Sequence, residues 1–218
     1  MERTGFIFDL DGVIVDTAKY HYLAWKKLAN QLGFDFTEEQ NEQFKGVSRR
    51  RCLEILLEMG NVEVPKQQFE DWLVEKNTDY LGYIETMNES EILPDVPKVL
   101  KYLKQEDIAM ALGSASKNAR PILEKVNLLS YFDAIVDGNE VTKAKPDPEV
   151  FLKAAEMLDA SPENCVVFED AVAGIEAANA AGMLTVGIGD AEILSQATYN
   201  FKDFTEIDLE FIKQLTNS

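Results

Sequence analysis

Two carboxylates one residue apart follow the first apolar segment of the chain. Phe6-Ile7-Phe8 stops at Asp9, and Asp11 comes two positions later. A carboxylate can attack phosphorus as a covalent nucleophile, and a second carboxylate beside it can act as a general acid and base. On its own, an Asp-x-Asp pair after a strand is more often part of a turn or a helix cap. The pair therefore indicates phosphoryl chemistry only if other reactive side chains lie close to it.

Reactive side chains also follow later apolar segments of the chain. Ser114 follows residues 108–113, Lys145 lies in the loop after residues 134–137, and Glu169-Asp170 ends another segment. Each has an ordinary interpretation too, as a solvated loop lysine or as a helix cap. If these segments are parallel strands, their carboxyl ends share one edge of a sheet, where ligands bind. We therefore expect these side chains to converge on Asp9.

If these side chains converge, several negative charges lie close together beside the positive charge of Lys145. Carboxylates at close quarters repel one another, and a divalent cation relieves that repulsion; oxygen ligands suit Mg²⁺. The cation and Lys145 would give an anionic phosphate a local positive site, and the Ser114 hydroxyl could hold a phosphate oxygen. The residue types therefore predict phosphoryl transfer assisted by Mg²⁺.

The elements that must position these residues read as an α/β fold. Several short segments are apolar throughout, as in strands buried on both faces of a parallel sheet. We expect strands at about 5–9, 108–113, 134–137, 165–168 and 184–188, and helices at 95–106, 117–127, 147–158 and 171–181. Asp147-Pro148 has the pattern of an N-cap followed by proline at the first helical position. The alternation predicts a Rossmann-like, doubly wound parallel sheet.

One long segment interrupts this alternation. Residues 17–87 contain no convincing strand and read as helices from about Thr17 to Gly33, over 49–59 and over 66–86. We interpret this segment as an inserted α-helical cap above the carboxyl edge of the sheet. The predicted domains are a core of residues 1–16 and 88–218 and a cap of residues 17–87.

Composition limits the possible partners. The chain has 21 Lys and Arg against 39 Asp and Glu, a formal net charge of −18, so nucleic acid and anionic membranes are poor general partners. Its 2 cysteines form no metal or disulfide pattern, and no signal peptide or membrane-spanning stretch is evident. We expect a cytoplasmic protein, a monomer, that acts on a small molecule.

Four segments together resemble the motifs of the haloacid dehalogenase (HAD) superfamily. They are Asp9-Leu10-Asp11-Gly12-Val13, Ser114, Lys145-Pro146, and the run from Glu169-Asp170 to Gly174-Ile175. The match covers essentially the whole chain in the expected order, with the insertion where this superfamily places its cap. The resemblance implies a Mg²⁺-dependent phosphatase or phosphomutase that forms an aspartyl-phosphate at Asp9. It also implies Asp9, Asp11, Glu169 and Asp170 as the metal site.

The cap segment is similar to that of the β-phosphoglucomutase family. The resemblance implies that His21 supports Asp11, that Thr17 lies at the hinge, and that Arg49 binds the distal phosphate. Ser114 and Ala115 would then serve the transferring phosphate, as would the catalytic Lys145. The further substrate-binding residues implied are Trp25, Lys45, Gly46, Val47, Ser48, Lys76, Ser116, Lys117 and Asn118. Arg50-Arg51-Cys52 departs from the family pattern and leaves the shape of the cap pocket open.

This resemblance implies interconversion of β-D-glucose 1-phosphate and glucose 6-phosphate. Glucose 1,6-bisphosphate would be the intermediate, with Asp9 as nucleophile and Asp11 as acid and base in turn. The main alternative is a sugar-phosphate phosphatase of the same fold, in which water replaces the second hydroxyl. A non-catalytic binding module is a further alternative, but it would be expected to lose Asp9, Asp11 or Lys145. Dinucleotide binding is excluded because no Gly-x-Gly-x-x-Gly follows the first strand.

Overall fold

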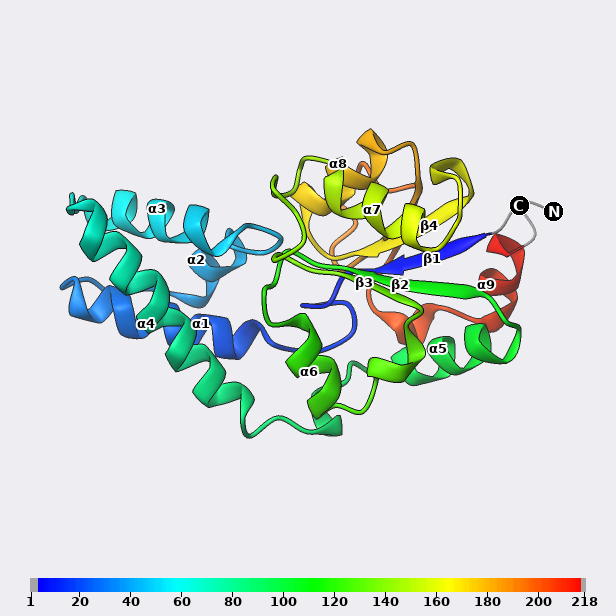
Figure 1. Cartoon of the computed structure of the whole chain (residues 1–218), viewed down its shortest axis with the longest axis horizontal. Helices are drawn as coiled ribbons and strands as arrows, with labels where there is room; N and C mark the ends of the chain where they lie inside the picture. The colour runs from blue at the N-terminus through cyan, green and yellow to red at the C-terminus, as the bar shows by residue number, and fades with distance from the viewer. Residues whose placement is uncertain (1–3, 217–218) are drawn as a thin grey trace.

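A parallel sheet forms the centre of the larger half of the molecule (Figure 1). The computed structural model describes residues 4–216, and within them the strand order is β3-β2-β1-β4-β5-β6. The strands are β1 (Gly5–Phe8), β2 (Ala109–Gly113), β3 (Ala134–Val136), β4 (Cys165–Glu169), β5 (Leu184–Ile188) and β6 (Tyr199–Phe201). β1 is paired on both sides, with Phe8 opposite Leu112 and Phe168, so neighbouring strands end at the same level.

Helices cover both faces of this sheet, as the apolar strands predict. The helices of this half are α5 (Val96–Gln105), α6 (Ala119–Lys125), α7 (Glu149–Met157), α8 (Val172–Ala180) and α9 (Leu209–Leu215). Figure 1 shows α5, α6 and α9 on one side of the sheet and α7 and α8 on the other. Phe6 and Phe8 belong to the apolar cluster that includes residues of α5, α6 and α9, whereas Ile7 belongs to the cluster with α7 and α8. Because successive strand residues point to opposite faces, both faces are buried and the fold is doubly wound α/β.

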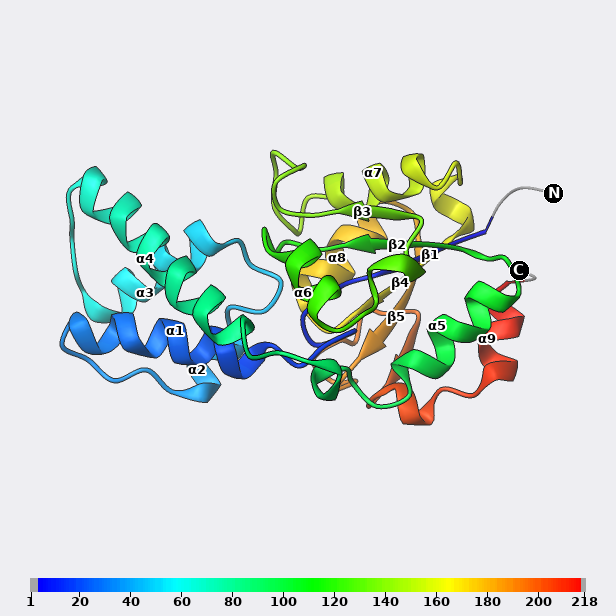
Figure 2. The same ribbon diagram turned by 60° about the horizontal axis from the view of Figure 1, so that its bottom comes forward.

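The remaining helices lie together beyond the carboxyl ends of the strands (Figures 1 and 2). They are α1 (Ala18–Gln31), α2 (Glu38–Glu42), α3 (Arg49–Gly60) and α4 (Lys66–Ile84). They have an apolar core of their own, which includes Trp25, Phe36 and Leu53. We call these helices the cap; its exact boundaries, 17–87, stay a prediction, and residues 1–3 and 217–218 of the predicted core lie outside the described residues.

Two linkers join the cap to the sheet, and they are paired with each other. Leu93 N–H donates to the Ile14 carbonyl at 3.0 Å, and Asp16 N–H donates to the Glu91 carbonyl at 2.9 Å. The chain therefore enters and leaves the cap at one place. Among the described residues, no helix has both the length and the apolarity to cross a membrane.

The structure differs from the sequence prediction at several elements. β6, α2 and α9 were not predicted; β6 is a short edge strand, partly exposed, which lacks the continuous apolarity of the central strands. The helix predicted from residue 147 begins at Glu149, with Pro148 at the N-cap position. Asp147 still caps it in part, because its Oδ1 accepts from Glu149 N–H at 3.1 Å.

Candidate active site

The acids at the ends of β1 and β4 meet a buried lysine. Lys145 Nζ lies 2.6 Å from Asp9 Oδ1 and 2.5 Å from Glu169 Oε1. Asp9 directly follows β1, where its N–H donates to the Phe168 carbonyl, and Glu169 is the last residue of β4. All three side chains are buried. The parallel register thus brings together side chains that lie up to 160 positions apart in the sequence.

Asp170 completes a group of carboxylates that suits a divalent cation. Asp9, Glu169 and Asp170 each offer an oxygen, and these oxygens lie within 4.8 Å of one another. Burial, followed by the neighbouring Glu169, raises the pKa of Asp170 above its usual range, and burial also raises the pKa of Glu169 despite Lys145. Crowded carboxylates that resist ionisation gain most from a hard cation with oxygen ligands. The residues therefore fit Mg²⁺.

Two glycines of the sequence motifs allow this crowding. Gly12 has a positive φ of 83°, and a Cβ there would lie 2.1 Å from Asp170 Oδ2. A Cβ at Gly174 would lie 1.8 Å from Glu169 Oε1. Glu169 is further held by Ala171 N–H, which donates to its Oε2 at 2.9 Å. Only glycine leaves room for the two carboxylates in these positions.

Asp11 lies beside this group and outside it. Its Oδ1 accepts a hydrogen bond from the Thr17 hydroxyl, and His21 Nε2 lies 3.9 Å away. Burial, together with the charge of Asp9, raises the pKa of Asp11 to about 6. A carboxyl group with a pKa near neutrality can both take and give a proton. Its assignment as a metal ligand stays a prediction, because its carboxylate is not part of the cluster formed by the other acids.

His21 belongs to a partly buried contact between α1 and α4. Its Nδ1 lies 3.0 Å from Lys76 Nζ, and burial lowers its pKa well below the usual value, so the ring is neutral. A protonated Lys76 donates to Nδ1, which places the ring proton on Nε2, facing Asp11. Lys76 Nζ also lies over the rings of Trp25 and Tyr80, at 4.7 and 4.6 Å from their centroids. Burial lowers the pKa of Lys76 to about 7.

Tyr80 was not predicted as part of the site. Its ring lies 4.2 Å from the His21 ring, and its side chain is fully buried. Its spacing of four residues places it on the Lys76 face of α4, because residues at i and i+4 share a helix face, but this spacing does not show that the face is turned toward the site. Trp25, predicted to bind substrate, is 1% exposed and packs in the cap core beneath Lys76.

The loop from Lys45 to Arg49 brings cationic groups from the cap. Lys45 Nζ lies 3.4 Å from Asp170 Oδ2, so this loop reaches the carboxylate cluster that Asp170 forms with Asp9 and Glu169. Ser48 caps α3, where its Oγ accepts from Arg51 N–H at 3.4 Å. Arg49, the first residue of α3, is half-buried and has no carboxylate partner in the described part of the chain.

Residues 50–52, which depart from the family pattern, have partners within the cap, and Arg50 and Cys52 also line the cavity. Arg50 pairs with Glu70 at 2.7 Å, and Arg51 pairs with Glu54 and Glu58 on the cap surface. Cys52 lies in the cap core, 3% exposed. Among these arginines, Arg49 is therefore the one whose charge stays available to a ligand.

The loop after β2 forms the opposite wall. Ser114 N–H donates to the Val136 carbonyl, and Ser114 Oγ accepts from Ser116 N–H at 3.1 Å. Ser116 Oγ in turn accepts from Asn118 N–H at 3.2 Å. Asn118 Nδ2 donates to Asn77 Oδ1 on α4 at 3.0 Å, a contact between the sheet half and the cap. Asn77 was not predicted, although it directly follows Lys76.

A cavity of about 850 Å³ joins these parts, between the cap and the carboxyl edge of the sheet. Most of the predicted site residues line it. They are Asp9, Asp11, His21, Trp25, Lys45, Gly46, Val47, Ser48, Arg49, Lys76, Ser114, Ala115, Ser116, Lys117, Asn118, Lys145 and Asp170. Two predicted residues, Thr17 and Glu169, lie behind the cavity wall, and both are 0% exposed. Thr17 is hydrogen-bonded to Asp11, and Glu169 is hydrogen-bonded to Lys145, so each contacts a residue that lines the cavity.

The chain is similar to known proteins that act on phosphorylated sugars and to one family model. A family model of haloacid dehalogenase-like hydrolases matches residues 4–182. The chain is 41% identical over 210 residues to a β-phosphoglucomutase of Bacillus subtilis (strain 168), covering 95% of this chain and 93% of that protein. It is 34% identical to a phosphorylated carbohydrates phosphatase of Thermotoga maritima, covering 81% of each. A crystal structure of β-phosphoglucomutase from Clostridium difficile superposes with a TM-score of 0.93 at 40% identity, covering 99% of this chain and 97% of that one.

Proposed function

Because the chain belongs to the haloacid dehalogenase-like hydrolase family, we propose that it is an enzyme that interconverts β-D-glucose 1-phosphate and glucose 6-phosphate. Glucose 1,6-bisphosphate is the intermediate in this proposal, and a small phosphorylated sugar is the partner. The alternative is a sugar-phosphate phosphatase, an activity that the Thermotoga relative's name describes. We also propose that residues 17–87 act as the cap domain of a monomer.

One observation carries the choice of a mutase. Arg49 is a half-buried cation that has no carboxylate partner among the described residues, and it lines the same cavity as Lys145 and Ser114. A mutase must bind a second, non-reacting phosphate, whereas a phosphatase needs only one phosphate site. A guanidinium group binds phosphate through two parallel hydrogen bonds, so Arg49 suits the second phosphate. Ser116, Lys117 and Asn118 line the same cavity and would assist it.

Mg²⁺ would be held by Asp9, Glu169 and Asp170, because each offers a carboxylate oxygen and these oxygens lie within 4.8 Å of one another. When bound, the cation neutralises these carboxylates and polarises the phosphoryl oxygens. Lys145 supplies a fixed positive charge at Asp9 in addition.

In the proposed reaction, a carboxylate oxygen of Asp9 attacks phosphorus and forms an O–P bond. The bond from phosphorus to the sugar oxygen breaks, which gives an aspartyl-phosphate and a sugar hydroxyl. Lys145 orients Asp9. Ser114, held by its bonds to Val136 and Ser116, follows the neighbouring strand β2 at the same edge of the sheet, where it would contact the phosphoryl oxygens. In the other half-reaction, the free 6-hydroxyl of β-D-glucose 1-phosphate attacks the aspartyl-phosphate, which forms glucose 1,6-bisphosphate and regenerates Asp9.

Asp11 moves the protons of both half-reactions. It donates a proton to the departing sugar oxygen, and it removes a proton from the hydroxyl that attacks the aspartyl-phosphate. Its pKa of about 6 makes both protonation states accessible near neutral pH. Thr17 orients its Oδ1, and the Nε2–H of His21, fixed by Lys76, faces the same oxygen.

Hydrolysis of the aspartyl-phosphate would waste the intermediate, so a mutase must exclude water. The cap contacts the sheet half through Lys45 with Asp170 and through Asn77 with Asn118. The residues of both contacts line the cavity, and the contacts support a closed state around the sugar.

A comparison of two nearby arginines tests the proposal. Arg49→Ala should lower formation of glucose 6-phosphate by on the order of 100-fold, because it removes a charge-assisted bidentate contact. Turnover of a small monophosphate, measured as phosphate release, should fall far less. Arg51→Ala is the matched control, because Arg51 pairs with Glu54 and Glu58 on the cap surface, away from the residues that line the cavity. Equal losses of both activities in Arg49→Ala would refute the assignment of a second phosphate site.

A further inference from the structure

We propose that Glu149 is a positioning residue for Lys145, because it closes the turn that carries this lysine against the start of α7. Lys145 lies near the end of the loop between β3 and α7, and its ammonium group reaches Asp9 and Glu169. The proposal rests on the chemistry proposed above for Asp9 and does not depend on which sugar is the substrate.

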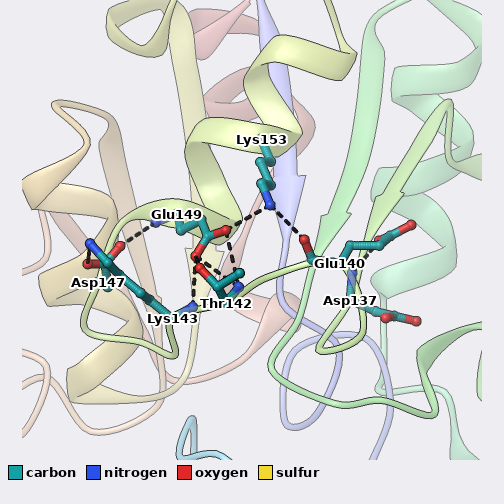
Figure 3. Close-up of polar contacts among 7 residues, drawn as sticks. All are labelled: Asp137, Glu140, Thr142, Lys143, Asp147, Glu149 and Lys153. Carbon is teal, nitrogen blue, oxygen red and sulfur yellow. Dashed lines mark hydrogen bonds and ion pairs between the residues drawn. The ribbon is translucent and has the colours of Figure 1, made fainter.

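The Glu149 carboxylate binds the backbone on the N-terminal side of Lys145. Its Oε2 accepts from Thr142 N–H at 3.0 Å, from the Thr142 hydroxyl at 2.9 Å and from Lys143 N–H at 2.7 Å. Figure 3 shows Glu149 directed back from α7 onto these two residues. A single carboxylate thus fixes the backbone two and three positions before the lysine.

The turn is also fixed on the C-terminal side of Lys145. Asp147 N–H donates to the Ala144 carbonyl at 3.0 Å, across the lysine itself. Glu149 N–H donates to Asp147 Oδ1 at 3.1 Å, and Lys143 Nζ lies 3.1 Å from Asp147 Oδ2 (Figure 3). Glu149 therefore contacts both arms of the turn, one through its carboxylate and one through its N–H.

Lys153 holds the Glu149 carboxylate in place. One turn along α7, its Nζ lies 2.7 Å from Glu149 Oε1 and donates to the Glu140 carbonyl at 2.6 Å (Figure 3). The hydrogen bond from Lys153, then that from Lys143 N–H, lowers the pKa of Glu149 to about 2. The negative charge also lies in the first turn of a helix, where the helix dipole favours it. Glu149 is thus ionised at every pH at which the enzyme would work.

Accurate placement of this turn matters for the chemistry. Residues 142–145 form part of the cavity wall, and Lys145 makes its contacts with Asp9 and Glu169 from a buried position. An error of 1 Å in the placement of a catalytic group can cost about 100-fold in rate. Displacement of the turn would move the Lys145 ammonium away from the phosphoryl group and from Asp9 together.

Variants at residue 149 test the proposal with three readouts. These are kcat and KM for glucose 6-phosphate formation, turnover of acetyl phosphate as a donor without a sugar, and amide hydrogen exchange along the whole chain. Glu149→Ala should lower kcat in both assays by on the order of 100-fold, with a smaller change in KM, and speed exchange within residues 137–148. Glu149→Asp, which keeps a carboxylate, should recover part of the rate. Glu156→Ala, an exposed acid on the same helix, is the control and should match the wild type.

Several outcomes would overturn the positioning role. A wild-type kcat in Glu149→Ala would do so, as would a fall in kcat without faster exchange in residues 137–148. Faster exchange over the whole chain would show a general loss of stability instead. If Glu149→Ala does not fold, Glu149→Gln keeps one carbonyl acceptor and should show a smaller loss with the same local pattern. If the wild type turns over acetyl phosphate but makes no glucose 6-phosphate, the sugar assignment fails, and the acetyl phosphate arm still decides the role of Glu149.

Discussion

Replacement of Lys76 by methionine should stabilise the protein and damage its activity. Lys76 is 2% exposed and has no carboxylate within ion-pair distance among the described residues. Its ammonium group is held by His21 Nδ1 and by the faces of Trp25 and Tyr80. Burial lowers its pKa from 10.5 to about 7, so the folded protein keeps this cation at a cost in free energy.

The size and sign of that cost follow from linkage. Because the pKa in the folded state lies below the unfolded value, the unfolded chain binds more protons between pH 7 and 10.5, and stability falls as the pH falls through that window. At about 1.4 kcal/mol for each pK unit, the cost is about 4 kcal/mol at pH 7 and about 2 kcal/mol at pH 9. Methionine removes the cost and packs well against aromatic rings. The cation–π contacts that it loses favour the charged lysine, so their effect is already contained in the pKa of about 7 and does not alter the difference expected between the two pH values.

Urea unfolding of Lys76→Met and wild type at pH 7 and pH 9 measures this effect. The stabilising difference in the free energy of unfolding should be about 2 kcal/mol larger at pH 7 than at pH 9. Lys66→Met, an exposed lysine of α4, is the control and should change stability little. Glucose 6-phosphate formation by Lys76→Met should fall by roughly 10- to 100-fold, the value of a hydrogen bond from a charged group. A stability difference that is the same at both pH values would refute the reasoning.

Three further predictions concern the acids. Asp11→Asn should lower kcat by roughly 10²–10⁴-fold. The wild-type rate should rise as the pH increases through about 6, because Asp11 then becomes a base, and this rise should be absent from the pH profile of the variant. Gly12→Ala should lower the free energy of unfolding by about 1–3 kcal/mol and weaken Mg²⁺ binding, measured by urea unfolding and calorimetry, because its φ is positive and the added Cβ meets Asp170. Unchanged Mg²⁺ affinity would contradict that account. Chelation by EDTA should abolish turnover and lower Tm, and added Mg²⁺ should restore both. Tm falls because a ligand that binds only the folded state stabilises that state. Full activity in EDTA would exclude the metal site.

The convergence of Asp9, Ser114, Lys145 and Glu169 could be predicted from sequence, and the reason is physical. Each follows or lies near an apolar segment that is buried on both faces, and burial of this kind requires a parallel sheet covered by helices. The carboxyl ends of such strands share one edge, so the position of a residue just after a strand predicts its place in the fold. The family resemblance added the cap residues that line the same cavity.

Contacts that depend on packing were not predictable in the same way. Lys76 lies 55 positions from His21, and the two meet because α1 and α4 cross at a particular angle in the cap. No local pattern specifies that crossing. Tyr80 shares the Lys76 face of α4, but the pattern alone could not show that this face is turned toward the site.

The role of Glu149 was hidden for a different reason. Its sequence position directly after Asp147-Pro148 suggests an ordinary acid in the first turn of a helix. Its carboxylate instead turns back to the loop that precedes the helix, which only the folded chain shows. The short edge strand β6 was likewise missed, because it lacks the apolar pattern that marked the central strands.

The most direct test of the central claim follows β-D-glucose 1-phosphate by phosphorus NMR. The protein is supplied with Mg²⁺ and a trace of glucose 1,6-bisphosphate, and Asp9→Asn is run in parallel. The account predicts conversion to glucose 6-phosphate with little inorganic phosphate in the wild type, and no conversion in Asp9→Asn. Release of inorganic phosphate as the main product would contradict it and assign the site to a phosphatase.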